Sequence, residues 1–251
     1  MTRRVALVTG GARGIGRAIC EGLAADERAV VVTDLLGDDA EATAAAIRDA
    51  GGEAMALPLD ITDSAAVTAA VEAVTEAWGA PEVLVNCAGW DDFKLFVDTD
   101  EAFWDRIIDI NYKGMLRTTH ACLPAMQAAG WGRIVNIASD AGRVGSSMES
   151  VYSGAKGGVI AFTKTIAREA ARAGVTANTV CPGPTDTPLL AELAGDGPKG
   201  EKMVTALERA VPMKRLAQPA DIASAVVYFA SEGAGYVTGQ TLSVSGGLTM
   251  S

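Results

Sequence analysis

Short apolar runs rich in Val, Ile, Leu and Ala alternate with longer segments of helical periodicity along the whole chain. Apolar runs without regular polar positions are typical of strands that are buried on both faces of a parallel sheet. We therefore predict seven strands, over residues 4–10, 29–34, 53–60, 81–89, 132–139, 175–183 and 240–247. Capping residues or glycines followed by helical periodicity predict helices over residues 14–27, 38–51, 62–79, 101–129, 151–173 and 219–231.

This alternation predicts a series of βαβ units with right-handed crossovers. The expected fold is α/β: a single doubly wound parallel sheet of seven strands with helices on both faces, formed by one domain over residues 1–251. Residues 184–210 depart from the pattern, because they are rich in Gly, Pro and charge. We expect a mobile excursion there, with a substrate lid at about 186–212. Ligands of such sheets bind where the strands end, so those residues hold the functional information.

Composition excludes several classes of function. The 251 residues contain 21 Lys and Arg against 31 Asp and Glu, for a net charge of −10, and no basic run is present. Nucleic-acid binding depends on concentrated positive charge, so we expect no nucleic-acid partner. No apolar stretch approaches the roughly 20 residues that span a bilayer, and no signal peptide is apparent. We expect no membrane partner and a cytoplasmic location.

Cysteine and histidine usage indicates neither disulfides nor a metal. Cys20, Cys87, Cys122 and Cys181 are scattered, without a CxxC pair or a histidine at ligand spacing. We expect four reduced thiols and no metal site. The single histidine, His120, lies in a predicted helix without a partner for catalysis, and we expect a structural role for it.

A glycine-rich loop follows the first predicted strand. The segment TGGARGIG (9–16) places Gly10, Gly14 and Gly16 between a strand and a helix. Glycines allow the tight turn and let the backbone approach a pyrophosphate, which the helix N-terminus attracts. Glycines also occur in ordinary turns, but the strand before and the helix after this loop favour nucleotide binding.

The ends of the next strands suggest how the nucleotide is held. Asp34 ends the second strand, where a carboxylate can accept hydrogen bonds from both adenosine ribose hydroxyls and would repel a 2′-phosphate. We therefore expect NAD rather than NADP, although Arg13 in the glycine loop is the one feature that favours NADP. Ala88 and Gly89, at the end of the fourth strand, are small enough for a flat ring or a ribose to lie against the backbone, or they form only a tight turn.

Three polar residues follow the fifth strand. Ser139 ends that strand, and Tyr152 and Lys156 stand one helical turn apart, so both project from the same helix face. A Tyr-xxx-Lys pair alone usually means a solvated helix face. Behind a nucleotide loop and a strand-end serine it is instead chemically meaningful, because a nearby ammonium would lower the tyrosine pKa of about 10. The serine hydroxyl can then hold the oxygen of a substrate.

These motifs resemble, in order and spacing, those of the short-chain dehydrogenase/reductase family in its shorter form, over essentially the whole chain. TGGARGIG, NCAG, Asn111, Ser139, Tyr152-xxx-Lys156 and PGPTDT (182–187) are the matching segments. The resemblance implies a Rossmann-type sheet and a homotetramer assembled through the C-terminal segment and two long helices. One departure is Cys87, where the family commonly has a second asparagine; we expect it to pack into the sheet.

The resemblance also implies roles for the matching residues. Tyr152 would be the general acid/base, Lys156 would lower its pKa and bind the nicotinamide ribose, and Ser139 would orient the substrate oxygen. Asn111 would hold a water in a proton relay from Lys156 to solvent. The residues expected around the cofactor are Gly10, Arg13, Gly14, Ile15, Gly16, Asp34, Leu35, Asp60, Ile61, Asn86, Ala88, Gly89, Tyr152, Lys156, Pro182, Gly183, Thr185 and Thr187. Among them, Asp60 would contact adenine and Thr187 the nicotinamide carboxamide.

A narrower resemblance, to the 2-hydroxycyclohexanecarboxyl-CoA dehydrogenases, concerns NCAGWDDFKLF, GRVGSSMES, VCPGPTDTPLL and LSVSGGLTM. It implies NAD-dependent oxidation of a secondary alcohol beside a CoA thioester to the 2-oxo compound, in a route that degrades alicyclic acids. The pocket candidates are Trp90, Arg143, Ser146, Met148 and Pro184. Lys94, Arg143, Lys199 and Lys202 are candidates to meet the CoA phosphates, or are ordinary solvated side chains.

Two other functions are consistent with these residues. The first is reduction of a 3-oxoacyl thioester, on CoA or on an acyl carrier protein, in biosynthesis; Asp34 argues against it, because such reductions usually use NADPH. The second is a non-catalytic nucleotide-binding protein on the same fold. The joint presence of Asn111, Ser139, Tyr152 and Lys156 argues against that possibility, since a protein without activity would be free to lose them.

Overall fold

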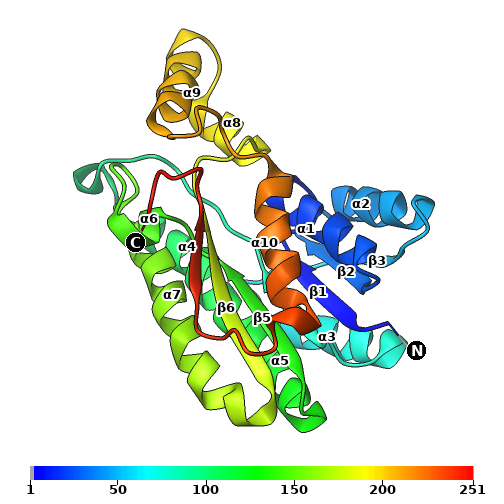
Figure 1. Cartoon of the computed structure of the whole chain (residues 1–251). Helices are drawn as coiled ribbons and strands as arrows, with labels where there is room; N and C mark the ends of the chain where they lie inside the picture. Colours follow the sequence, from blue (N-terminus) through cyan, green and yellow to red (C-terminus); the bar gives the residue numbers. More distant parts are fainter. Residues whose placement is uncertain (1–2, 251) are drawn as a thin grey trace.

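A single sheet of seven parallel strands forms the centre of the protein, in the order β3-β2-β1-β4-β5-β6-β7 (Figure 1). The computed structural model describes residues 3–250. The strands are β1 (Val5–Thr9), β2 (Ala29–Asp34), β3 (Glu53–Pro58), β4 (Val83–Asn86), β5 (Gly132–Ile137), β6 (Val175–Pro182) and β7 (Thr241–Val244). The predicted α/β class and all seven predicted strands are confirmed, with shorter bounds for most strands.

Helices cover both faces of this sheet. They are α1 (Gly14–Ala25), α2 (Gly37–Asp49), α3 (Ser64–Trp78), α4 (Glu101–Ile108), α5 (Gly114–Ala129), α6 (Ala141–Val144), α7 (Ser150–Ala170), α8 (Pro188–Ala194), α9 (Pro198–Ala210) and α10 (Pro219–Ala230), with short turns η1 (Phe96–Asp98), η2 (Asp109–Lys113), η3 (Ala171–Ala173) and η4 (Glu232–Ala234). None of the helices in residues 3–250 is long and apolar enough to cross a membrane.

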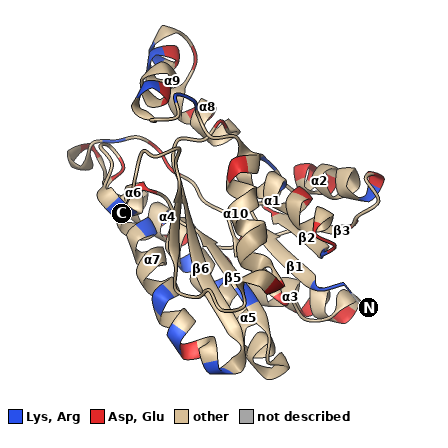
Figure 2. Ribbon diagram, viewed as in Figure 1, with Lys and Arg blue, Asp and Glu red and all other residues tan. Residues whose placement is uncertain are grey.

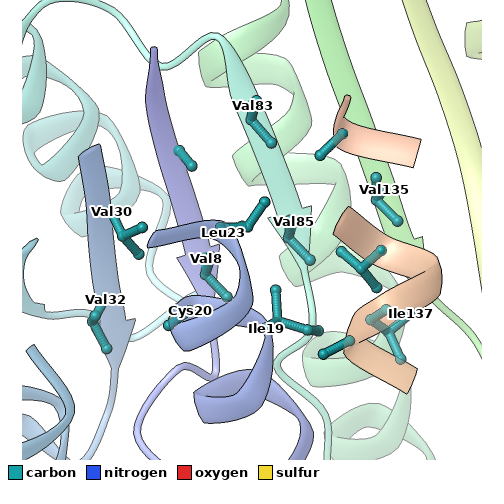
Figure 3. Close-up of a cluster of buried hydrophobic side chains, with 14 of the residues drawn as sticks. Val8, Ile19, Cys20, Leu23, Val30, Val32, Val83, Val85, Val135 and Ile137 are labelled. Atoms are coloured by element: carbon teal, nitrogen blue, oxygen red, sulfur yellow. The ribbon is translucent and has the colours of Figure 1, made fainter. Parts of the chain in front are cut away.

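Two apolar layers hold the helices on the sheet. On one face, side chains of α1, α2 and α10 pack on the strands; Figure 3 shows Ile19 and Leu23 of α1 against Val8, Val85 and neighbouring strand residues. On the other face, α3, α5 and α7 pack on the alternate strand residues. Each fully buried aliphatic side chain stabilises the fold by about 1.5–3 kcal/mol. Cys87 packs against the apolar layer between the sheet and helices α1, α2 and α10, as predicted. All four cysteines are free thiols.

The strand order places a crevice between β1 and β4. After β3 the chain returns past β1 to begin β4, so the connections on the two sides of this point run in opposite directions. The ends of β1 and β4 approach closely there, since a Cβ built on Gly10 would lie 2.7 Å from the Cα of Ala88. Thr9 strengthens the junction, because its hydroxyl accepts hydrogen bonds from the backbone N–H groups of Cys87 and Ala88, both at 3.2 Å.

The helix predicted over residues 101–129 is confirmed along its length, with a π-turn in its middle. Between α4 and α5 the backbone forms η2, a π-turn over Asp109–Lys113 that contains Asn111. A π-turn inserts an extra residue and frees a carbonyl group, and such turns are frequent at functional sites. Apolar periodicity did not reveal it, because both flanking helices keep their own buried residues, such as Ile107 and Met115.

The predicted excursion after β6 contains two helices, α8 and α9. Figure 1 shows them standing out from the body of the molecule, beyond the end of β6. Thr187 begins α8, since its hydroxyl accepts a hydrogen bond from the Leu190 N–H at 3.2 Å, and Pro188 occupies the first helical turn. The segment returns to the sheet beside β6, where the backbone N–H of Ala217 donates to the Pro184 carbonyl at 2.9 Å.

Candidate active site

The glycine loop between β1 and α1 has the geometry of an anion-binding turn. Gly10 and Gly14 have φ values of +69° and +54°, which favour glycine. Gly16 passes so close to the turn that a Cβ there would lie 1.8 Å from the Gly10 carbonyl oxygen. No side chain caps the start of α1. Its first backbone N–H groups therefore remain available to phosphate oxygens, with the helix dipole oriented favourably.

Asp34 lies beside this loop at the end of β2. One carboxylate oxygen accepts from the Ala12 N–H at 3.1 Å, and the other accepts from the Leu36 N–H at 3.0 Å. These bonds fix the carboxylate against the glycine loop, and each oxygen keeps a lone pair for another donor. The neighbouring Leu35 is 72% exposed, so it can lie over a flat group held there.

The base of the α8–α9 excursion also meets the glycine loop. A Cβ built on Gly14 would lie 3.5 Å from Thr187 Cγ2 and Pro188 Cδ. Above this contact Arg13 forms an ion pair with Glu192 of α8, at 2.7 Å. Arg13 is therefore turned toward α8, which reduces its availability for a 2′-phosphate. Thr187 thus lies next to the glycine loop, and its expected contact with the nicotinamide carboxamide stays a prediction.

Asn111 joins the π-turn to the loop that follows β4. Its side-chain N–H₂ donates to the carbonyl oxygens of Trp90 at 2.6 Å and Ile107 at 3.0 Å, and its oxygen accepts from the Trp90 N–H at 3.2 Å. A Cβ on Gly89 would lie 2.9 Å from the Asn111 oxygen and 3.5 Å from Lys156 Nζ. Gly89, Asn111 and Lys156 thus meet at one point, although they are far apart in sequence.

Ser139, Tyr152 and Lys156 come together at the end of β5. Lys156 is 3% exposed, and its Nζ donates to the Ile137 carbonyl oxygen at 3.0 Å and lies 5.5 Å from the centre of the Tyr152 ring. Ser139 is within hydrogen-bonding reach of the Tyr152 phenol. The close approach of α6 and α7 at Gly142, where a Cβ would lie 2.6 Å from the Lys156 carbonyl carbon, fixes the start of α7.

In the protein chain by itself the Tyr152 pKa lies above its ordinary value, and the lowering effect expected of Lys156 stays a prediction. Burial raises the pKa of the Tyr152 phenol, and the charges of Asp91 and Glu149 raise it further, whereas the hydrogen bond with Ser139 opposes the shift. Burial also lowers the pKa of Lys156 to about 8. The nearby Cys87, Cys181 and Asp91 act in the opposite direction, but they do not outweigh the effect of burial. A positive ligand beside the phenol would be needed to bring the Tyr152 pKa down.

Three residues predicted to line the cofactor, Asn86, Ile61 and Asp60, have side-chain contacts within the protein. The Asn86 carboxamide is buried and donates to Asn136 at 2.8 Å and to Thr119 at 3.2 Å, so only its backbone faces the crevice. Ile61 is buried against Gly114. The Asp60 carboxylate is exposed and accepts from the Thr62 N–H and hydroxyl at 2.8 and 2.7 Å.

The residues of the loop after β6 also contact other parts of the protein. Gly183 packs on Ser245, where a Cβ would lie 2.7 Å from the serine Cβ, and the buried Thr185 hydroxyl donates to the Gly183 carbonyl at 2.9 Å. Pro182 and Pro184 flank this turn and are half-buried. The Thr185 hydroxyl is thus engaged within the turn itself.

The predicted pocket residues lie on two loops. Trp90 contacts Phe103 and lies under the guanidinium of Arg106, 3.7 Å from the ring centre. Ser146 and Met148 are exposed, and Met148 has φ +68°, an uncommon value for a side-chain-bearing residue. Arg143 does not extend freely toward the pocket, because its guanidinium donates to the Ser243 hydroxyl at 2.5 Å.

The basic side chains considered for CoA phosphates are dispersed. Lys94 pairs with Asp92 at 3.0 Å and lies over Phe103, whereas Lys199 and Lys202 are exposed on α9. Figure 2 shows basic and acidic residues together on α9, and acidic residues prominent on α2. Among residues 3–250 no group of His, Cys, Asp and Glu is arranged to hold a metal ion.

Two acidic residues near the phenol were not singled out from the sequence. Asp91 is buried, and both it and Glu149 influence the pKa of Tyr152. In the sequence, the segment WDDF was notable only because it resembles the corresponding segment of the 2-hydroxycyclohexanecarboxyl-CoA dehydrogenases. An aspartate in a loop is ordinarily solvated. No signal in one sequence distinguishes a buried loop aspartate from an exposed one.

Comparison with known proteins agrees with this geometry. Residues 10–249 match the family model described as enoyl-(acyl carrier protein) reductase. The short-chain reductase protein NovJ of Streptomyces niveus is 41% identical over 97% of this chain and 93% of its own length. The 3-oxoacyl-[acyl-carrier-protein] reductase FabG of Vibrio cholerae is 39% identical over 98% of both chains. The chain belongs to the short-chain dehydrogenase/reductase family.

A solved structure supports the same assignment. The crystal structure of a point variant of actinorhodin polyketide ketoreductase with NADPH superposes with a TM-score of 0.93, at 36% identity, covering 98% of this chain and 97% of that one. This protein is accordingly an oxidoreductase of the family that acts on secondary alcohols and ketones with a nicotinamide cofactor. The uncapped start of α1, the glycine turn and the carboxylate of Asp34 fit the pyrophosphate and adenosine of such a cofactor.

Proposed function

We propose that this protein is an NAD-dependent oxidoreductase that interconverts a β-hydroxyacyl and a β-oxoacyl compound. The leading substrate is a cyclic β-hydroxyacyl-CoA such as 2-hydroxycyclohexanecarboxyl-CoA, which would be converted to its 2-oxo form. The main support for NAD is the Asp34 carboxylate, which is fixed by two backbone hydrogen bonds beside the glycine loop. The support for the chemistry is the grouping of Ser139, Tyr152, Lys156 and Asn111 at the ends of β4 and β5.

In this proposal each of the four residues has a separate task. Tyr152 takes the hydroxyl proton in oxidation and returns it in reduction. Ser139 holds the substrate oxygen next to the phenol. Lys156, fixed by the Ile137 carbonyl, binds the nicotinamide ribose, and Asn111 positions the water that connects Lys156 to solvent. The bound cofactor supplies the hydride acceptor and, when oxidised, a positive ring that favours the Tyr152 phenolate.

The cofactor choice can be tested at Asp34. We expect Asp34→Ala to lower the ratio of kcat/KM with NAD to kcat/KM with NADP by about 10- to 100-fold, because hydrogen bonds to a charged group contribute about 1.5–3 kcal/mol. Steady-state kinetics with both cofactors measures this ratio. The exposed Asp39→Ala in α2 is the matched control and should leave it unchanged. An unchanged ratio in Asp34→Ala would mean that the carboxylate does not contact the ribose.

A second candidate is reduction of 3-oxoacyl thioesters with NADPH. The relatives named 3-oxoacyl-[acyl-carrier-protein] reductase, and the ketoreductase structure with NADPH, favour it. Asp34 and the Arg13–Glu192 ion pair argue against it, because the first repels a 2′-phosphate and the second engages the nearest arginine. A panel of secondary alcohols and ketones, free and as CoA thioesters, assayed with both cofactors decides between them. A strong preference for NADPH and an acyl-carrier-protein substrate would establish the second candidate.

We further propose a homotetramer in the cytoplasm. The edge strand β7 and the chain after it expose Leu242, Leu248 and Met250, and the connection before it exposes Tyr236 completely. Apolar residues gathered at a sheet edge are typical of surfaces that pair with a second copy. Sedimentation equilibrium would measure the assembly, and a monomer at micromolar concentration would exclude it.

A further inference from the structure

A chain of hydrogen bonds joins the residue after Ser139 to the edge strand β7. The Ser243 hydroxyl donates to one carboxylate oxygen of Asp140 and accepts from the Arg143 guanidinium at 2.5 Å. Asp140 and Ser243 are 103 positions apart in the chain, and β6 lies between β5 and β7 in the sheet. The three residues thus connect the end of β5 to a strand that supplies none of the four residues assigned above to the reaction.

Asp140 depends on this chain because it is a buried acid. It is 6% exposed, and Ser243 is the only hydrogen-bond donor to its carboxylate among residues 3–250, since the second carboxylate oxygen has no partner there. A buried carboxylate is costly unless donors and positive charge compensate it. The Ser243 hydroxyl supplies the donor, and the Arg143 guanidinium bonded to that hydroxyl supplies the positive charge.

The same chain holds α6, the short helix that begins two residues after Ser139. This helix has only four residues, and a single turn is not stable by itself, so contacts outside the helix must hold it. Gly142 packs directly on the backbone of α7, where an added Cβ would lie 2.6 Å from the Lys156 carbonyl carbon. Arg143 is bonded to Ser243 of β7. The helix is therefore attached both to α7 and to β7.

The position of α6 determines the position of the Ser139 hydroxyl. The Ser139 hydroxyl oxygen accepts a hydrogen bond from the Ala141 N–H at 3.1 Å, and the Ser139 carbonyl accepts from the Gly142 N–H at 3.0 Å. The first bond leaves the hydroxyl hydrogen free to be donated to a substrate oxygen. A shift of α6 moves the hydroxyl away from that oxygen, and a misplacement of about 1 Å can cost about 100-fold in rate.

We propose that Asp140, Arg143 and Ser243 are positioning residues: their hydrogen-bonded chain holds α6 in place and thereby sets the Ser139 hydroxyl where it meets the substrate oxygen. This inference rests on the proposed function, because it concerns the task given there to Ser139. It assigns Arg143 a role within the protein rather than a contact with CoA phosphates. Since every substrate of the reaction carries the oxygen that Ser139 binds, the chain should affect all substrates alike.

Two variants of similar shape isolate the Ser243 hydroxyl. Thr and Val both add bulk at the position, but only Thr keeps a hydroxyl, so the effect of the bulk is shared. We expect Ser243→Val to have a kcat about 10- to 100-fold below that of Ser243→Thr, because the chain is broken. The Kd for NAD should stay within about threefold of the wild-type value in both variants. Steady-state kinetics and fluorescence titration measure the two quantities.

The control for these variants is Ser224→Ala on α10. Ser224 is exposed, and its hydroxyl donates only to the Ala220 carbonyl of its own helix, at 2.9 Å. Loss of this hydroxyl should leave both kcat and the Kd for NAD at their wild-type values.

A double-mutant comparison shows whether the chain acts through Ser139. In the Ser139→Ala background the hydroxyl that the chain positions is absent. Adding Ser243→Thr or Ser243→Val to this background should therefore give the same kcat, within about threefold. If Ser243 only supported the fold, the Val variant would fall below the Thr variant by the same factor in both backgrounds.

Arg143→Met tests the other end of the chain, because it keeps a long side chain but removes the guanidinium. The probes are 2-hydroxycyclohexanecarboxyl-CoA and methyl 2-hydroxycyclohexanecarboxylate, which has the same ring and no phosphate. We expect kcat to fall about tenfold, and by the same factor with both probes, because Ser139 is displaced in both cases. A loss confined to the CoA thioester would mean that Arg143 binds its phosphates, and would overturn the inference, as would no loss with either probe.

Failure of the inference and failure of the proposed function give different results. If the wild type turns over the probes, equal kcat in Ser243→Thr and Ser243→Val overturns the inference alone. An undiminished difference between these variants in the Ser139→Ala background does the same. No turnover of any β-hydroxyacyl or β-oxoacyl compound by the wild type overturns the proposed function, and this inference with it. NAD titration verifies the fold of each variant, and the half-buried Arg143 decides the matter through Arg143→Met if Ser243→Val does not fold.

Discussion

Tyr152→Phe is expected to lower kcat by about 10²- to 10⁴-fold, the usual contribution of a positioned acid or base. The substitution removes only the phenol oxygen and leaves the ring, so the start of α7 and the position of Lys156 should persist. Affinity for the nicotinamide cofactor should change by less than about threefold, since the phenol contacts the substrate rather than the adenosine half. Steady-state kinetics and a fluorescence titration with NAD measure the two quantities.

The control for this substitution is Tyr228→Phe. Tyr228 lies on α10 and is 49% exposed, so loss of its hydroxyl should alter neither quantity. Turnover retained by Tyr152→Phe would contradict the assignment of the general acid/base. A variant that loses both turnover and NAD affinity would indicate instead that the phenol supports the structure of the crevice.

Much of the fold and the centre of the site could be predicted from the sequence, because simple chemistry determines both. Apolar runs such as VALVT and VVV must be buried on two faces, which requires a parallel sheet with helices on each side. Parallel strands end on the same edge, so Gly10, Asp34, Gly89 and Ser139 had to meet there. Their convergence follows from topology and needs no knowledge of side-chain packing.

Other features depend on side-chain geometry that a single sequence does not encode visibly. The side chain of Asn86 could face either the crevice or α5, and the hydroxyls of Thr118 and Thr119 determine that it faces α5. Arg143 is drawn to Ser243 of the distant strand β7. Such pairings are decided by neighbours more than thirty residues away, which local patterns do not specify.

The electrostatics of the site were the least predictable part. A Tyr-xxx-Lys spacing implies that the ammonium lowers the phenol pKa, but it contains no information on burial or on acids from other loops. In the folded chain burial raises the pKa of the phenol, and Asp91 and Glu149 act in the same direction. The phenol is therefore suited to remain protonated until a positive ligand binds, which would couple proton abstraction to the presence of oxidised cofactor.

Gly16→Ala is expected to abolish useful cofactor binding, raising the Kd for NAD by about tenfold or more. A Cβ on residue 16 would lie 1.8 Å from the Gly10 carbonyl oxygen and 2.7 Å from the carbonyl carbon, both of them backbone atoms. No rotamer change can relieve that overlap, so the turn itself must move away from α1. The movement displaces the N–H groups that face the pyrophosphate, and overpacking of this kind typically costs about 1–3 kcal/mol.

Gly154→Ala provides the matched control, because it adds the same methyl group to a helix. Gly154 is exposed on α7, and no heavy atom lies within 4 Å of an added Cβ. This variant should keep the wild-type Kd and gain up to about 1 kcal/mol in the free energy of unfolding, since alanine favours helices over glycine. NAD titrations and urea denaturation of both variants measure the contrast. Equal NAD affinity in Gly16→Ala and Gly154→Ala would contradict the prediction. It would mean that the N–H groups at the start of α1 face the pyrophosphate without the close approach of Gly16 to Gly10.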